Sequence, residues 1–182
     1  MNRVVVINVV GLCDRHIGPD MPFLSAFRER MQHRHIDPAF PAVTCTAQSD
    51  YVTGKTASGH GIVGNGWYNR DLAEVQFWKQ PNQLVQGTKV WDTLRARHAD
   101  FTFAKVFWWY NMYSSADWSL TPRPMYPADG RKVFDIYTYP ASIRAEIKQD
   151  LGEFPFPGFW GPAAGMTTPQ GSADCVSCWI AE

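Results

Sequence analysis

The stretch Val4-Val5-Val6-Ile7-Asn8-Val9-Val10 decides the fold that we expect for this chain. It is a continuous, largely β-branched run without regular alternation, which is typical of a strand buried on both faces at the centre of a parallel sheet. Gly11-Leu12 ends the run. We therefore expect residues 4–10 to form the first central strand of a sheet.

The segments after this run alternate between helical and extended patterns. Phe101 to Trp109 resembles a second core strand, and glycine is dense from Gly54 to Gly66, which predicts a loop that serves a site. Helical patterns occupy Met21 to Gln32, Thr44 to Asp50, Lys89 to Arg97 and Pro140 to Leu151. Strands that alternate with helices predict an α/β fold, with a parallel or mixed sheet sandwiched by helices.

The composition is that of a folded domain. The chain has 182 residues, its 17 Lys and Arg balance 17 Asp and Glu, and 8 Trp, 7 Tyr and 11 Phe can fill a sizeable core. The zero net charge argues against general binding of nucleic acids. No segment approaches the roughly 20 apolar residues of a membrane span, and residues 4–10 are short for a signal-peptide core. We therefore expect a cytoplasmic protein with reduced cysteines and no membrane partner.

Three motifs in the first half of the chain carry the chemistry. They are Pro41-Ala42-Val43-Thr44-Cys45-Thr46, Val52-Thr53-Gly54, and His60-Gly61-Ile62-Val63-Gly64-Asn65 followed by two aromatic residues. In order and approximate spacing they resemble the nucleotide pyrophosphatase/phosphodiesterase branch of the alkaline phosphatase superfamily, over roughly Val4 to Trp78. The resemblance implies an alkaline-phosphatase-like fold and hydrolysis of a phosphodiester or pyrophosphate bond in a small molecule or nucleotide.

The resemblance also implies roles for two residues. Thr44 matches a threonine nucleophile that begins a helix, binds zinc and forms a covalent phosphoryl intermediate. Coordination by a metal lowers the pKa of a hydroxyl that is otherwise a poor nucleophile. Asn65 matches an asparagine whose amide donates to a non-bridging phosphate oxygen, where charge builds in the transition state. The free N–H groups and the dipole of the helix favour the same anion.

The sequence departs from the family at the ligands of the two zinc ions that the resemblance implies. The family's first metal-binding carboxylate comes as Asp-Gly at the end of the first strand, where this chain has Val10-Gly11. Asn8 is the nearest side chain able to coordinate, two residues earlier on the same face of the expected strand. Its neutral amide is a weaker ligand than a carboxylate. The family's further Asp and His ligands lie later in a longer domain, whereas no histidine follows His98 here.

We therefore interpret residues 1–165 as the N-terminal part of a phosphodiesterase-like domain that is incomplete. Residues 166–182 read as an irregular tail, produced by a truncation or a change of reading frame. We expect weak or no hydrolysis from this chain alone, and self-association through an uncovered sheet edge. The alternative is a non-catalytic module that binds a phosphorylated ligand or a protein partner. A phosphatase or phosphomutase of the same superfamily is a second enzymatic alternative.

Several of these residues also have a purely structural interpretation. Thr44 taken alone would more often cap a helix than attack phosphorus. We expect His60 to organise its loop by hydrogen bonds, since the family has no metal ligand there. The segment from Phe107 to Tyr113 could stack a nucleobase, but aromatic runs after a strand more often pack in the core.

Two further groups have weaker functional interpretations. Arg123 and Lys132 could reach a phosphate, although surface placement is the commoner role of such residues. Cys175-Val176-Ser177-Cys178 is a Cys-x-x-Cys pair without a second pair or nearby histidines, so it is a weak indication of a zinc or redox site.

Overall fold

The structure is a computed structural model, and it describes residues 3–156. The chain divides into two compact units, Met1–Asp37 and Pro38–Glu182. The boundary that we expect at residue 165 lies outside the described residues.

The described part of the first unit contains a 3₁₀-helix, an α-helix and a long extended segment. The 3₁₀-helix η1 spans Asp14–His16 and the α-helix α1 spans Pro22–Arg30, which confirms the predicted helix. A proline in the first turn favours this start, because its missing N–H would be unpaired there in any case. The aromatic rings of Phe23 and Phe27 stack on α1 with their centroids 6.5 Å apart.

The prediction of a buried central strand at residues 4–10 is wrong. These residues belong to neither sheet, and the apolar side chains among them are 54 to 82 % exposed. The β-branched composition favours an extended backbone, and the segment is extended. A buried strand also needs a hydrogen-bonded neighbour on each side, and composition alone does not supply one.

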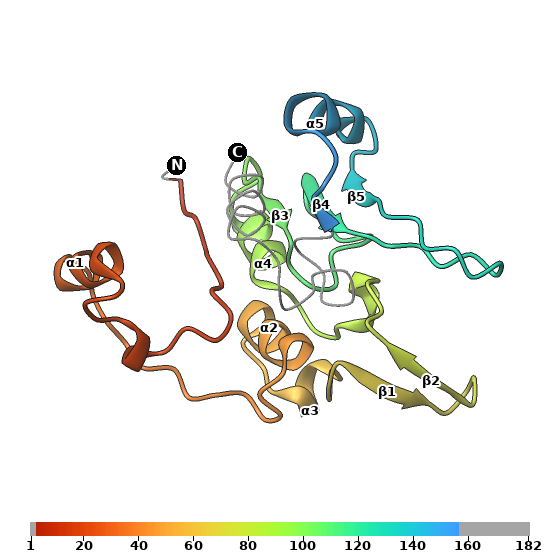
Figure 1. Ribbon diagram of the computed structural model, residues 1–182. Coiled ribbons are helices and arrows are strands. Elements are labelled where there is room, and N and C mark those ends of the chain that lie inside the picture. Colours follow the sequence, from red (N-terminus) through yellow and green to blue (C-terminus); the bar gives the residue numbers. More distant parts are fainter. Residues whose placement is uncertain (1–2, 157–182) are drawn as a thin grey trace. The chain divides into compact units, whose positions relative to one another are not determined.

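The second unit begins with two helices and a hairpin. Helix α2 spans Thr44–Thr53 and begins at the predicted residue, α3 spans Ala57–His60, and the antiparallel strands β1 and β2 span Gly66–Asn69 and Glu74–Phe77 (Figure 1). The glycine-rich segment is therefore only partly a loop. Gly54 and Gly61 end α2 and α3 with φ of 64° and 81°, a conformation that glycine adopts without strain.

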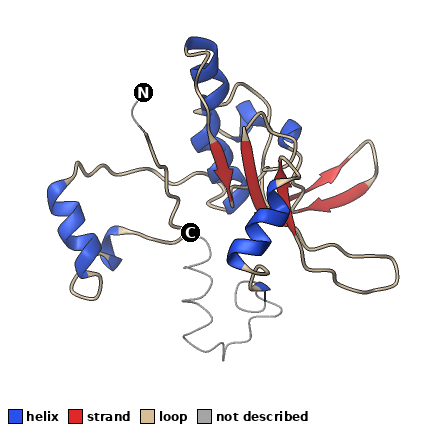
Figure 2. Ribbon diagram, turned by 90° about the horizontal axis from the view of Figure 1, so that it is seen from above, coloured by secondary structure: helices blue, strands red, loops and turns tan. Residues whose placement is uncertain are grey.

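A three-stranded sheet forms the rest of the second unit. Strand β3 spans Ala104–Val106, β4 spans Trp118–Pro122 and β5 spans Ile136–Tyr139; β3 pairs parallel with β4, and β4 pairs antiparallel with β5 (Figure 2). The 3₁₀-helix η2 (Asn82–Leu84) and helix α4 (Val90–Arg97) precede the sheet, and helix α5 (Ile143–Leu151) follows it. The predicted mixed sheet and both predicted helices are confirmed, although β3 is shorter than expected.

Helices cover both faces of this sheet. Lys105 of β3 contacts the Trp91 ring of α4, and its partner Ser119 is buried on the same face. Leu120 is one residue further along β4 and therefore faces the other way. It packs in a cluster with Ile136 and with Ile147 of α5. The expected α/β class, with a sheet sandwiched by helices, is confirmed.

A second cluster backs the hairpin and α2. Its buried members are Cys45, Ile62, Val85 and Tyr110. They come from α2, the loop after α3, the segment after η2 and the segment after β3, so this cluster holds the first half of the unit to the sheet.

No described helix has the length and apolar character needed to cross a membrane.

Candidate functional site

The N-terminus of α2 is the centre of the candidate site. Thr44 is the first residue of the helix and is half-buried. The preceding Val43 provides no side-chain cap, and the first turn carries no acidic residue. The Ala47 N–H donates to the Val43 carbonyl at 3.0 Å. No acceptor is recorded for the N–H groups of Thr44 and Thr46 within residues 3–156. These groups and the helix dipole therefore favour an anion beside Thr44.

Asn65 reaches the same helix turn from outside the helix. Its Oδ1 accepts the Cys45 N–H at 3.0 Å, and its backbone carbonyl accepts the Trp78 N–H at 3.0 Å. A backbone N–H can only donate, so the amide oxygen must face Cys45 and the Nδ2 group points the other way. No acceptor is recorded for this Nδ2 in the described part of the chain. The structure therefore brings the Asn65 amide to the backbone N–H of the residue that follows Thr44.

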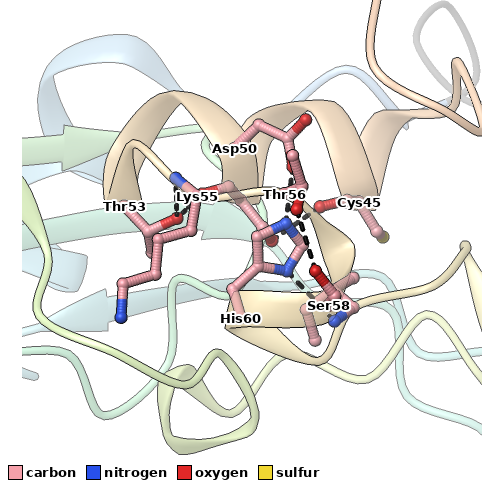
Figure 3. A network of polar contacts seen from close by, with 9 residues as sticks. Cys45, Asp50, Thr53, Lys55, Thr56, Ser58 and His60 are labelled. Carbon is pink, nitrogen blue, oxygen red and sulfur yellow. Dashed lines mark hydrogen bonds and ion pairs between the residues drawn. The ribbon is translucent and has the colours of Figure 1, made fainter.

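Three hydrogen bonds of His60 hold the loop that carries Asn65. His60 is completely buried, and its Nε2 lies 2.5 Å from Oδ1 of Asp50 on α2 (Figure 3). Its Nδ1 accepts the Ile62 N–H at 3.1 Å, and its carbonyl accepts the Gln86 N–H at 2.9 Å. The prediction that His60 organises its loop by hydrogen bonds is confirmed. No pattern in the sequence indicated that Asp50 is its partner.

Buried groups support α2 from behind. Cys45 and Tyr110 pack in one cluster, and burial raises the pKa of the Cys45 thiol to about 12 and also raises the pKa of Tyr110. The Gln48 side-chain oxygen accepts the backbone N–H of Trp109 at 2.7 Å. The residues that follow β3 are thereby joined to the helix that begins with Thr44.

Lys105 is a buried lysine that contacts Tyr110. Its side chain is 5 % exposed, and its Nζ donates to the Tyr110 carbonyl at 2.6 Å and lies 5.0 Å from the centre of the Trp91 ring. Burial, and then the nearby charge of Lys89, lower the pKa of Lys105 to about 7. No carboxylate pairs with it among residues 3–156. The sequence did not indicate that Lys105 is buried, because a lysine in a predicted strand is usually exposed.

The described residues do not provide a donor set that fits zinc. No group of three or more His, Cys, Asp or Glu side chains able to hold a metal occurs within residues 3–156. The Cys45 thiol keeps its proton at neutral pH because burial raises its pKa, and both nitrogens of His60 already have partners. Asn8 lies in the first unit, in exposed extended backbone.

The remaining predicted residues have structural positions. Tyr110 is 2 % exposed, and the Trp109 ring packs edge-on against Trp78 at 4.9 Å, so the core interpretation of these two aromatic residues is confirmed. Arg123 and Lys132 are exposed. The Cys-x-x-Cys pair at residues 175–178 lies outside the described residues.

Comparison with known proteins identifies the family. The sequence matches the family described as type I phosphodiesterase / nucleotide pyrophosphatase over residues 4–171. This match spans both described units and includes Thr44 and Asn65. No curated protein and no solved structure matches the chain. The family is one of metal-dependent hydrolases with an alkaline-phosphatase-like fold, and the match covers most of the 182 residues. The chain therefore belongs to the type I phosphodiesterase / nucleotide pyrophosphatase family.

Proposed function

We propose that this chain binds a small phosphodiester or nucleotide at the start of α2, that Thr44 is the nucleophile for its hydrolysis, and that turnover by this chain alone is weak or absent. One observation carries the proposal: the Cys45 N–H, in the residue after Thr44, donates to Oδ1 of Asn65 at 3.0 Å and so leaves the Nδ2 group of this amide to donate elsewhere. A neutral donor can bind a non-bridging phosphate oxygen. Family membership supports the substrate class.

The chemistry that we propose is a double displacement at phosphorus. The Thr44 oxygen forms a bond to phosphorus, the bond to the leaving alcohol or phosphate breaks, and the hydroxyl proton passes to solvent. Water then releases the phosphoryl group from Thr44. During both steps, Nδ2 of Asn65 and the N–H groups of the first helix turn donate to the oxygens on which charge builds.

Zinc and its ligand Asn8 stay predictions for this chain. No carboxylate or imidazole is recorded in contact with Thr44 among residues 3–156, so the residues described here offer no general base for its hydroxyl. We therefore propose that turnover by this chain alone is weak or absent.

A second candidate function is binding without hydrolysis. Asn65 and the first-turn N–H groups would hold the bound phosphate as well as the transition state, because both carry charge on the same oxygens. A phosphorylated ligand could therefore be retained without attack by Thr44.

Turnover of bis(p-nitrophenyl) phosphate with added zinc tests the proposal. Thr44→Ala should abolish any turnover, Thr44→Ser should retain part of it, and Asn65→Ala should lower kcat by roughly 10²-fold or more. Thr53→Ala is the matched control, since it removes a hydroxyl that donates to the Ser49 carbonyl at 2.7 Å elsewhere on α2. Turnover that survives Thr44→Ala would refute the nucleophile. Binding of inorganic phosphate by calorimetry, with no turnover, would establish the binding module instead.

A further inference from the structure

We propose that Asp50 and His60 are a positioning pair that places the Asn65 amide at the start of α2. The inference rests on the proposed function of Asn65 for its significance. Its structural content is independent of that function, because it concerns a hydrogen bond that can be observed without a substrate.

The first step is the state of the His60 ring. The ring is 0 % exposed, and its two nitrogens face groups of opposite kinds. The Ile62 N–H can only donate, so Nδ1 carries no proton and accepts at 3.1 Å. The proton therefore resides on Nε2, which donates to Oδ1 of Asp50 at 2.5 Å. Both contacts together fix one tautomer and one orientation of the ring.

The second step is the path from this ring to Asn65. Gly61 has φ of 81° and turns the chain, so that the Ile62 N–H points back and donates to Nδ1 of the His60 ring. The Ile62 side chain is 2 % exposed and lies in the same cluster as Cys45. Only two residues separate Ile62 from Asn65. The orientation of the turn therefore limits where Asn65 can reach.

The third step is that one helix holds both ends of the loop. Asp50 lies in the second half of α2 and holds His60, whereas the Cys45 N–H lies in its first turn and holds Asn65. Figure 3 shows the His60 ring against α2, with Asp50 above it. Losing the Asp50 contact would free the first end of the loop, and the hydrogen bond at the second end would weaken as a consequence.

The test observes the Cys45 amide directly. The chain has four cysteines, so protein labelled with ¹⁵N-cysteine gives four amide signals, and Cys45→Ser identifies the one required. Asn65→Ala defines the signal when the hydrogen bond is absent. We expect Asp50→Ala to move the Cys45 signal toward this reference and to accelerate its hydrogen exchange roughly tenfold. Asp50→Asn keeps an acceptor oxygen and should restore the exchange rate to within about twofold of the unsubstituted chain.

Two further variants guard against general loosening of the helix or loss of the fold. His60→Asn keeps an acceptor for Ile62 but cannot reach Asp50, and it should behave as Asp50→Ala does. Thr53→Ala removes the bond to the Ser49 carbonyl in the same helix and should leave the Cys45 signal unchanged. The proposal is overturned if both Asp50→Ala and His60→Asn leave the Cys45 amide as it was. It is also overturned if Thr53→Ala changes the amide as much as Asp50→Ala.

The outcome is separable from that of the proposed function. Thr44→Ala should abolish turnover and leave the Cys45 amide protected from hydrogen exchange, because the acceptor of that amide is the Asn65 side chain. If the unsubstituted chain neither turns over a phosphodiester nor binds phosphate, the proposed function fails. The amide measurement still decides the role of Asp50 and His60 in that case.

Discussion

Replacing Lys105 by methionine should stabilise the protein at neutral pH and remove most of the rise in stability between pH 7 and 9. Lys105 is 5 % exposed, and burial, with the charge of Lys89 second, lowers its pKa to about 7 from the ordinary value of 10.5. The unfolded chain therefore binds more protons than the folded chain between these two values. The contribution of Lys105 to the free energy of unfolding therefore rises with pH throughout this window and is constant below it.

The magnitude follows from the two pKa values. Each pKa unit corresponds to about 1.4 kcal/mol, so holding Lys105 with a pKa of about 7 lowers the free energy of unfolding at pH 7 by roughly 4 kcal/mol. The penalty falls to about 2 kcal/mol at pH 9. Methionine keeps the apolar stem and loses the bond to the Tyr110 carbonyl, which retains the Asn82 amide at 3.0 Å. That loss costs about 1 kcal/mol, which leaves a net gain of roughly 3 kcal/mol at pH 7 and about 1 at pH 9.

Urea unfolding at pH 7, 8 and 9, followed by tryptophan fluorescence, measures this difference. The series stops at pH 9 because the Cys45 thiol, whose pKa burial raises to about 12, makes stability fall with pH above its ordinary value of 9.0. Lys132→Met is the matched control at an exposed lysine and should parallel the unsubstituted chain. Lys105→Arg, which keeps the charge at all these pH values, should destabilise the fold. Parallel curves for Lys105→Met and the unsubstituted chain would refute a buried lysine held neutral.

Two other substitutions test separate parts of the second unit. Asp135→Asn should lower the free energy of unfolding by about 2 kcal/mol and reduce the loss of stability in acid. Asp135 is partly buried, yet its ion pairs with Arg144 and Lys148 keep its pKa below the ordinary value. Equal acid midpoints of the two proteins in urea titrations would contradict this expectation. Gly61→Ala and Gly130→Ala, at φ of 81° and 83°, should each lower the free energy of unfolding by about 1–2 kcal/mol, measured by thermal unfolding. Only Gly61→Ala should weaken phosphate binding. Equal phosphate affinities of the two variants would contradict a role of the Gly61 turn in positioning Asn65.

Local patterns predicted the helices well and the strands less well. Helical spacing located α1, α4 and α5, and the change to polar residues located the first residue of α2, because each signal lies within the element itself. Residues 4–10 have strand composition without strand pairing, since pairing depends on neighbours that the segment does not contain. The β1–β2 hairpin was not predicted, because its strands have only four residues each and carry no clear alternation of buried and exposed side chains.

The candidate site was predictable as residue types but not as an arrangement. The motifs selected Thr44 and Asn65, whereas only the structure shows that Asn65 contacts the amide next to Thr44. Asp50 and Lys105 could not be selected, because a carboxylate in a polar helix and a lysine in a strand each have many ordinary roles. Their burial and partners come from segments distant in the sequence.

The uncapped start of α2 makes ligand occupancy and folding one coupled equilibrium. Val43 offers no side chain to the first turn, so a bound anion would complete the end of the helix as a native cap does. A ligand present at a hundred times its dissociation constant would then stabilise the folded chain by about 2.7 kcal/mol. The folded population of this chain would accordingly depend on how much phosphorylated metabolite surrounds it, and protein prepared without one would sample an opened helix start more often.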